Sequence, residues 1–92
     1  MKKIRVHVYI SGRVQGVGYR YSTAHKANSL GITGWVRNTH DGKVEAIFEG
    51  DENAVEEMIV WCKKGPSMSM VTDIEIFRKP FEGEFNNFSI RG

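Results

Sequence analysis

The sequence predicts an α+β fold in which two helices cover one face of a mainly antiparallel β-sheet. Residues 4–10 alternate apolar and polar side chains, which is the period of a half-buried strand. Two later segments repeat apolar residues at helical spacing, and glycine or proline separates them from further short alternating runs. Elements that are apolar on one side only bury that side most simply as helices packed on a sheet.

The N-terminal third is expected to form a strand, a loop and a helix. Ile4 to Ile10 alternate in polarity and predict the first strand. A glycine-rich loop over residues 12–20 follows. Ser22 is then expected to cap a helix that Gly31 ends. The apolar stripe of this helix consists of Ala24, Ala27 and Leu30.

Residues 32–39 and 43–49 are expected to form the two strands of a hairpin. A three-residue loop with Gly42 in the left-handed conformation would pair Asn38 with Val44 and keep the apolar residues of both strands on one face. A two-residue Asp-Gly turn would place those apolar residues on opposite faces, so the three-residue loop is favoured. Asn38 then ends the core-facing row, where an apolar side chain is the usual choice.

The C-terminal half is expected to contain a helix and two strands. Asp51 is placed to cap the helix, and Gly65-Pro66 ends it. A strand follows at residues 72–76, and a last short strand is expected to turn Phe88 and Ile90 inward. The helix stripe consists of Val55, Met58, Ile59 and Cys62. The resulting βαββαβ order, with a possible terminal strand, is that of a ferredoxin-like α/β sandwich.

The loop over residues 12–20 is the strongest functional signal in the chain. Glycines let successive backbone N–H groups turn toward one point, and a helix N-terminus adds partial positive charge. A plain strand-to-helix connection would account for the glycine spacing equally well. Arg20 favours an anion site, because it is expected just ahead of the helix, whose first N–H groups would face the same anion, and its planar guanidinium suits a phosphate or a carboxylate.

Several familiar motifs are excluded. A dinucleotide fingerprint would need glycine in place of Tyr21, and the Gly-Lys-Ser/Thr of a Walker A loop is absent. A Cys-x5-Arg phosphatase loop would need cysteine where Val14 stands, six positions before Arg20. The only cysteine, Cys62, lies on an apolar helix stripe and is expected to pack in the core.

The remaining titratable residues predict neither a metal site nor a general base. His7, His25 and His40 are expected on a strand, a helix and a turn, without the spacing of metal ligands. No acid lies inside the glycine loop, and a solvated face is expected for acids such as Glu45, Glu49, Glu56 and Glu57.

Composition places the chain among ordinary globular proteins. Ninety-two residues suit a single domain, 1–92, for which we expect a monomer. The formal charge of +2 comes from interspersed acids and bases, so a nucleic-acid partner is not expected. No signal-like or membrane-spanning stretch is apparent, and one cysteine cannot form an internal disulfide. We therefore expect a cytoplasmic protein without a membrane partner.

Two motifs together resemble those of the acylphosphatase family. They occupy residues 12–20 (GRVQGVGYR) and 34–45 (GWVRNTHDGKVE). The similarity extends over nearly the whole chain, including Gly65-Pro66 and the ending at residues 88–90. Tyr19 stands where phenylalanine is more usual, a change that could tune loop packing or stability. Ser67 and Ser69 stand where the family often has proline and alanine.

The resemblance implies hydrolysis of the mixed anhydride between a carboxylic acid and phosphate. Arg20 would bind the phosphate oxygens, and the side-chain amide of Asn38 would orient the attacking water. The family works without metal, cofactor or phosphoenzyme, on small molecules such as acetyl, carbamoyl or glyceroyl phosphate, and releases inorganic phosphate. Backbone N–H groups would complete the phosphate cradle, from Gln15, Gly16, Val17, Gly18, Tyr19 and Arg20.

The residue inventory suits this chemistry. A carboxylate leaving group has a pKa of about 4, so it needs no strong general acid. Phosphoryl transfer depends mainly on positioning and charge stabilisation, which a cradle, one arginine and one amide can provide. A substrate phosphate oxygen is our hypothesis for the acceptor of the water's proton.

Two other function classes remain as alternatives. A non-catalytic module of this fold could bind RNA, but residues 44–48 do not resemble the aromatic motif of an RNA-recognition strand. A phosphate or carboxylate sensor would keep the cradle without turnover. Asn38 argues against the sensor, which would have no evident need for an amide that positions water.

Overall fold

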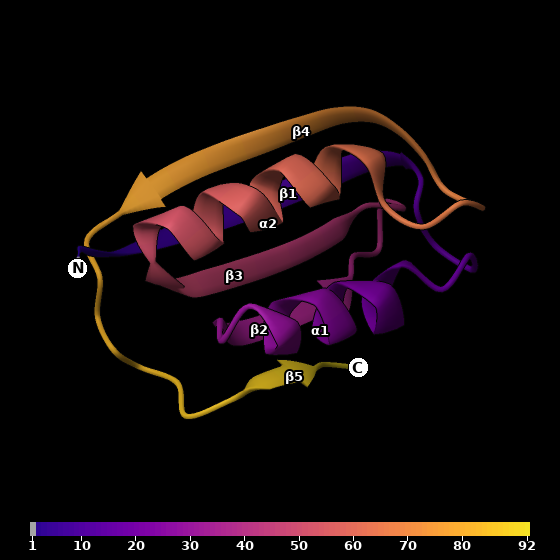
Figure 1. Cartoon of the computed structure of the whole chain (residues 1–92). Helices are drawn as coiled ribbons and strands as arrows, with labels where there is room; N and C mark the ends of the chain where they lie inside the picture. Colours follow the sequence, from indigo (N-terminus) through magenta and orange to yellow (C-terminus); the bar gives the residue numbers. More distant parts are fainter. Residues whose placement is uncertain (1) are drawn as a thin grey trace.

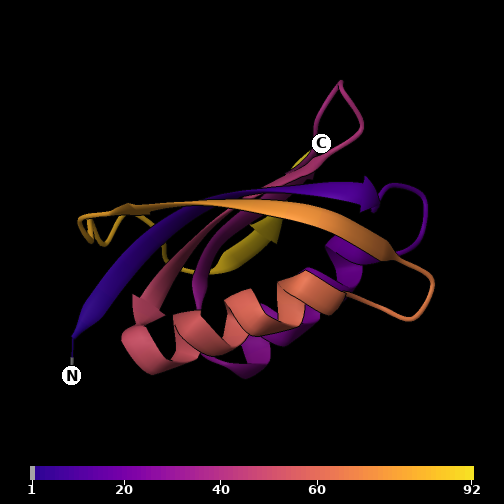
Figure 2. The same cartoon turned by 90° about the horizontal axis from the view of Figure 1, so that it is seen from above.

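The computed structural model describes residues 2–92 and shows two helices on one face of a five-stranded sheet (Figure 1). The view in Figure 2 places both helices on the same side of the strands. The strand order is β4-β1-β3-β2-β5, and only the β2–β5 pair is parallel. The elements are β1 (Lys3–Arg13), α1 (Tyr19–Ser29), β2 (Thr33–Asn38), β3 (Val44–Asp51), α2 (Glu52–Lys64), β4 (Met70–Lys79) and β5 (Phe88–Ile90). The predicted ferredoxin-like α+β class is confirmed.

The hairpin between β2 and β3 has the predicted register. Asn38 pairs with Val44, and the Thr39 N–H donates to the Lys43 carbonyl at 2.9 Å, which closes a three-residue loop. Gly42 in that loop has φ 88°, the left-handed conformation that the register requires. This loop keeps the apolar residues of both strands toward the helices.

The first helix begins earlier than predicted. Gly18 is its N-cap, with φ 78°, and no side chain caps the helix. The Ser22 N–H already donates to the Gly18 carbonyl at 3.0 Å, so Ser22 lies in the first turn and cannot cap it. A glycine with positive φ turns the chain directly into the helix, which makes a capping side chain unnecessary. Arg20 is consequently the second residue of α1, not a residue ahead of it.

The second helix begins and ends where predicted. Asp51 occupies the N-cap, but its side chain makes no capping bond and instead accepts from Lys3 Nζ at 3.3 Å. The whole predicted apolar stripe of α2 is buried. Within residues 2–92, neither helix is both long enough and apolar enough to cross a membrane.

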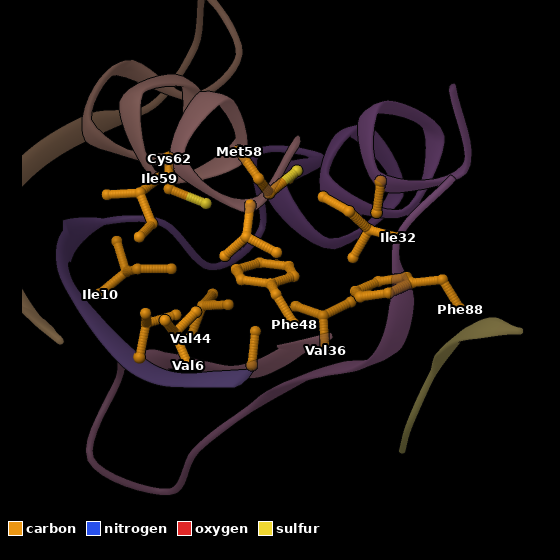
Figure 3. Packing of buried hydrophobic residues seen from close by; sticks show 14 of the residues in the cluster. Val6, Ile10, Ile32, Val36, Val44, Phe48, Met58, Ile59, Cys62 and Phe88 are labelled. Carbon is orange, nitrogen blue, oxygen red and sulfur yellow. The ribbon is translucent and has the colours of Figure 1, made fainter. Parts of the chain in front are cut away.

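The core lies between the two helices and the sheet. Met58, Ile59 and Cys62 of α2 face the sheet side chains, among them Ile10 and Phe48 (Figure 3). Phe48 stacks on Phe88 of β5, with ring centroids 5.6 Å apart. The inward orientation predicted for Phe88 is therefore confirmed.

Ile90 is less buried than predicted. It shares the inward face of β5 with Phe88, but its side chain is 38% exposed. β5 is an edge strand that pairs with β2 alone, so no further strand shields the outer side of Ile90. The inward position of a strand residue thus predicts burial only where another layer covers it.

The sheet face without helices carries buried charges, which corrects the prediction of a solvated acidic face. Glu45 on β3 is buried, with its carboxylate 2.6 Å from His7 Nε2 and 2.6 Å from Arg37 Nη2. Glu49 on the same strand is fully buried. Cross-strand partners of opposite charge cover both carboxylates, and the sequence alone does not show which strands pair. Glu56 forms an exposed ion pair on α2, as the prediction required.

Glu49 ties the segment between β4 and β5 to the sheet. Arg5 Nη1 lies 3.1 Å from its carboxylate. Backbone N–H groups also donate to it, from Glu82 at 2.9 Å, Gly83 at 3.2 Å and Glu84 at 3.0 Å. Burial alone would raise the pKa of Glu49, but the hydrogen bonds, that from Glu82 foremost, outweigh burial and hold the pKa below its usual range.

Glu49→Gln is expected to lower the free energy of unfolding by about 3 kcal/mol, near the low end for breaking a buried ion pair, because Arg5 keeps Glu84 as a partner. Glu56→Gln is the matched control. It breaks an exposed pair with Arg78 and is expected to cost less than about 1 kcal/mol. Urea unfolding at pH 7 measures both. Equal losses of unfolding free energy in the two variants would contradict the role of Glu49 in holding this segment to the sheet.

The stability contribution of Glu49 is expected to depend on pH. Folding lowers its pKa, so the contribution is complete above the unfolded pKa of about 4.3 and is lost as pH falls through the folded value. The difference in unfolding free energy between wild type and Glu49→Gln should therefore shrink steadily below about pH 4.3. Unfolding at pH 7 and pH 3 tests this expectation, and an unchanged difference would refute it.

Candidate active site

The loop between β1 and α1 forms a concave backbone surface. It is shorter than predicted, because Gly12 and Arg13 extend β1 and pair with β4. Gly16 has φ 75° and Gly18 has φ 78°, whereas no non-glycine residue of the described chain has positive φ. Left-handed glycines at every second position allow successive N–H groups to turn toward one side. A Cβ on either glycine would meet no atom within 4 Å, so conformation, not space, requires glycine there.

The backbone N–H groups of residues 15–20 have no hydrogen-bond acceptor within residues 2–92. The first bond of α1 runs from Ser22 N–H to the Gly18 carbonyl, so the N–H groups before it remain available. No acidic residue lies in the first turn of α1 to neutralise its N-terminus. The run can therefore donate to the oxygens of an anion.

Arg20 and Asn38 border the same pocket, although α1 carries one and β2 the other. This loop pocket has a volume of about 160 Å³ and is lined by Val14, Gly16, Gly18, Tyr19, Arg20, Tyr21 and Asn38. Asn38 Oδ1 is buried and has no hydrogen-bond partner among the described residues. Within the same residues the Arg20 guanidinium has no carboxylate within 4.0 Å. An amide oxygen and a guanidinium are thus both available to a molecule in the pocket.

Gln15 connects the loop to the hairpin that follows Asn38. Its Nε2 donates to the Thr39 carbonyl and to the Lys43 carbonyl, each at 2.8 Å. Sequence reasoning expected only the backbone of Gln15 to contribute and missed this side-chain role. The signal that could have identified this role is a long amide side chain in a glycine-rich loop, because such a loop needs side-chain bonds to a neighbouring segment to hold its position.

Tyr19 anchors the start of α1 in the core. Its hydroxyl donates to the Cys62 carbonyl at 2.7 Å. In a continuing helix that carbonyl would accept from residue 66, but Pro66 has no N–H, so the tyrosine satisfies a carbonyl that phenylalanine would leave open. Burial raises the pKa of the Cys62 thiol to about 12, which fits its predicted packing role.

The donor groups of the site suit an anion. Guanidinium and backbone N–H groups donate hydrogen bonds and offer no lone pair to a metal. His7, His25 and His40 lie on β1, on α1 and in the hairpin loop, the separate elements that the sequence predicted. Within residues 2–92, no three His, Cys, Asp or Glu side chains gather closely enough to hold a metal ion.

Comparison with known proteins gives one consistent family. The family model for acylphosphatase matches residues 6–90. An acylphosphatase of Syntrophobacter fumaroxidans is 54% identical over 90 residues, which cover 98% of this chain and 93% of that protein. An acylphosphatase of Thermococcus kodakarensis is 49% identical over 83 residues, covering 90% and 91%. The crystal structure of acylphosphatase from Bacillus subtilis superposes with a TM-score of 0.93 at 37% identity, covering 97% and 99%. The chain therefore belongs to the acylphosphatase family of enzymes.

Proposed function

We propose that the protein hydrolyses the carboxyl-phosphate bond of acyl phosphates to a carboxylate and inorganic phosphate, by direct attack of water, without metal, cofactor or phosphoenzyme. One observation carries this proposal. Within residues 2–92, the Arg20 guanidinium without a carboxylate partner, the unsatisfied Asn38 amide oxygen and part of the free N–H run, at Gly16, Gly18, Tyr19 and Arg20, border one pocket of about 160 Å³. Family membership supports the class of substrate.

Arg20 and the loop N–H groups bind the phosphate in this proposal. Arg20 donates to two phosphate oxygens through its planar fork, and the N–H groups of residues 15–20 surround the others. In phosphoryl transfer, negative charge is spread over the equatorial oxygens in the transition state. Donors already fixed by the loop stabilise that charge without reorganisation, and this contributes most of the rate enhancement.

Asn38 orients the attacking water. Its buried Oδ1 accepts a hydrogen bond from the water and leaves a water lone pair directed at phosphorus. The water's proton passes to a phosphate oxygen of the substrate. A pH–rate profile that contains a carboxylate-dependent step, removed by mutation of one acid, would contradict this route.

The lining of the loop pocket supports direct attack by water. Among its described residues, none carries a thiol, an imidazole or a carboxylate. The Tyr19 hydroxyl is occupied by its bond to the Cys62 carbonyl. The leaving carboxylate, with a pKa of about 4, departs without a protein acid.

The test is hydrolysis of benzoyl phosphate by the purified protein in EDTA, with the phosphoryl group labelled and the enzyme acid-quenched during turnover. We expect turnover that survives chelation and no label on the protein. Turnover that requires an added metal, or label retained on the protein, would refute the corresponding part of the mechanism. Folded protein that binds phosphate without turnover would instead indicate a phosphate sensor.

Gln15→Ala is expected to lower kcat/KM for benzoyl phosphate about 10- to 100-fold, because it removes both bonds that hold the loop against the hairpin carrying Asn38. The backbone N–H of residue 15 remains. Ser29→Ala is the matched control, since it removes a side-chain-to-backbone bond at the far end of α1 and should leave kcat/KM unchanged. Steady-state kinetics measure both. Unchanged kinetics in folded Gln15→Ala would show that the loop keeps its position without this connection.

We further propose that residues 1–92 form one domain that works as a cytoplasmic monomer without a nucleic-acid partner. Interspersed charges with a net of +2 support the absence of a nucleic-acid partner. The buried position of the single cysteine, Cys62, is compatible with a reducing compartment.

A further inference from the structure

Two larger recesses each share one lining residue with the loop pocket. The helix groove, of about 590 Å³, is lined by Tyr21, Ser22, His25, Lys26, Trp61 and Pro66, and shares Tyr21 with the loop pocket. The sheet cavity, of about 550 Å³, shares Asn38 with it and is bordered by Trp35, Arg37 and Arg91. We propose that the helix groove holds the acyl group, so that the enzyme favours acyl phosphates with an aromatic or other apolar acyl group. This inference rests on the proposed function.

The in-line geometry of phosphoryl transfer selects the helix groove. Attacking and leaving oxygens lie on opposite sides of phosphorus. Since Asn38 holds the attacking water, the carboxylate leaves on the side of the pocket away from Asn38. Of the two recesses, the helix groove contains Tyr21 but not Asn38, whereas the sheet cavity contains Asn38 but not Tyr21, so the groove is the one apart from the water position. The acyl group consequently extends over the outer face of α1.

The side chains of the groove suit an apolar occupant. Tyr21 and Trp61 present aromatic rings, and Pro66 adds an apolar wall. Lys26 is paired with Glu57, with Nζ and Oε2 3.4 Å apart, which offsets the one permanent cation of the groove. An aromatic or aliphatic acyl group can leave water against these surfaces.

The contact between α1 and α2 that positions the loop pocket also forms the helix groove. The hydrogen bond from Tyr19 to the Cys62 carbonyl holds the start of α1 against the end of α2. The Tyr19 ring packs on Trp61, with centroids 5.7 Å apart. Both views show the loop before α1 and the loop after α2 at the same end of the molecule (Figures 1 and 2). The contact between the start of α1 and the end of α2 therefore positions both Arg20, which lines the loop pocket, and Tyr21, which lines the groove together with Trp61.

The sheet cavity has the opposite character. Arg37 and Arg91 lie over the Trp35 ring, with guanidinium carbons 5.7 and 4.8 Å from its centroid. An acyl group bound there would carry negative charge and would lie on the Asn38 side. That position coincides with the side assigned to water, so the two recesses predict different substrate preferences.

The test compares benzoyl phosphate with acetyl phosphate in each variant, as the ratio of their kcat/KM values. This ratio cancels effects on the phosphoryl step that both substrates share. Tyr21→Ala is expected to lower the ratio about ten-fold, the loss expected for one aromatic contact with apolar burial, and Tyr21→Phe to preserve it. Val60→Ala, at a 67% exposed apolar residue of α2 outside the groove, should leave the ratio unchanged.

The outcomes separate the inference from the proposed function. An unchanged ratio in Tyr21→Ala overturns the acyl subsite while hydrolysis itself stands. A ratio that changes in Arg91→Gln but not in Tyr21→Ala places the acyl group in the sheet cavity and also refutes the water position at Asn38. Wild-type protein that hydrolyses neither substrate rejects the proposed function, and the subsite with it.

Discussion

Arg20→Ala is expected to lower kcat/KM for benzoyl phosphate by at least about 1,000-fold and to weaken inhibition by inorganic phosphate at the same time. Among the described residues, this guanidinium is the only cation that lines the loop pocket. In the proposed mechanism it contacts the phosphate oxygens in the ground state and more strongly in the transition state, where their charge is spread. Binding and turnover therefore fall together, since one set of charge-assisted bonds supports both.

Arg13→Ala is the matched control for this prediction. Arg13 ends β1, five positions before the N-cap Gly18, and does not line the loop pocket. Its loss changes the net charge equally but should leave kcat/KM within about three-fold, because an exposed charge is screened by salt. Circular dichroism must show both variants folded. Turnover retained in Arg20→Ala, or lost equally in Arg13→Ala, would reject the assigned role.

Asn38→Ala is expected to lower kcat about 100- to 1,000-fold, a loss comparable to removal of one preorganised polar group from an active site. The inhibition constant of phosphate should change less than about three-fold, since Asn38 contacts the water and not the phosphate. Steady-state kinetics with phosphate as inhibitor measure both quantities. Equal losses of turnover and phosphate affinity would contradict the division of roles between Asn38 and Arg20.

The stability of Asn38→Ala gives a second readout that a structural role would not produce. A buried, unsatisfied polar oxygen costs about 1–3 kcal/mol, so its removal should leave the unfolding free energy unchanged or raise it. Asn28→Ala, at an exposed residue of α1, is the control and should affect neither turnover nor stability. A folded state clearly destabilised by Asn38→Ala would indicate that the amide supports the structure.

Local patterns in the sequence were sufficient for the architecture. The α2 stripe and the β2–β3 register follow from spacing within one element or one short loop, and both are confirmed. Arg20 and Asn38 stood out from their positions beside the glycine loop and at the end of a core-facing row, the family resemblance supplied their roles, and the structure brings them to one pocket. Their catalytic roles remain predictions, which the two substitutions above test.

The helix start shows where local pattern fails. Ser22 is a good capping residue by type, but Gly18 already turns the chain into α1. Side-chain preference describes what a residue can do, whereas the main-chain conformation of the preceding loop decides whether the helix needs it. The buried state of Glu45 and Glu49 was missed for a related reason, because burial depends on which strand lies alongside.

The sequence by itself determined the elements, the register of the hairpin and the residue types that could bind an anion, because these depend on neighbours a few positions apart. Only the tertiary structure decided which distant groups meet. Gln15 reaches a carbonyl 24 positions away, and Arg5 reaches Glu49 across 44 positions. Likewise, Tyr21 and Trp61 form a groove only because α1 and α2 pack side by side. Such contacts arise from the packing of whole elements, which no local pattern records.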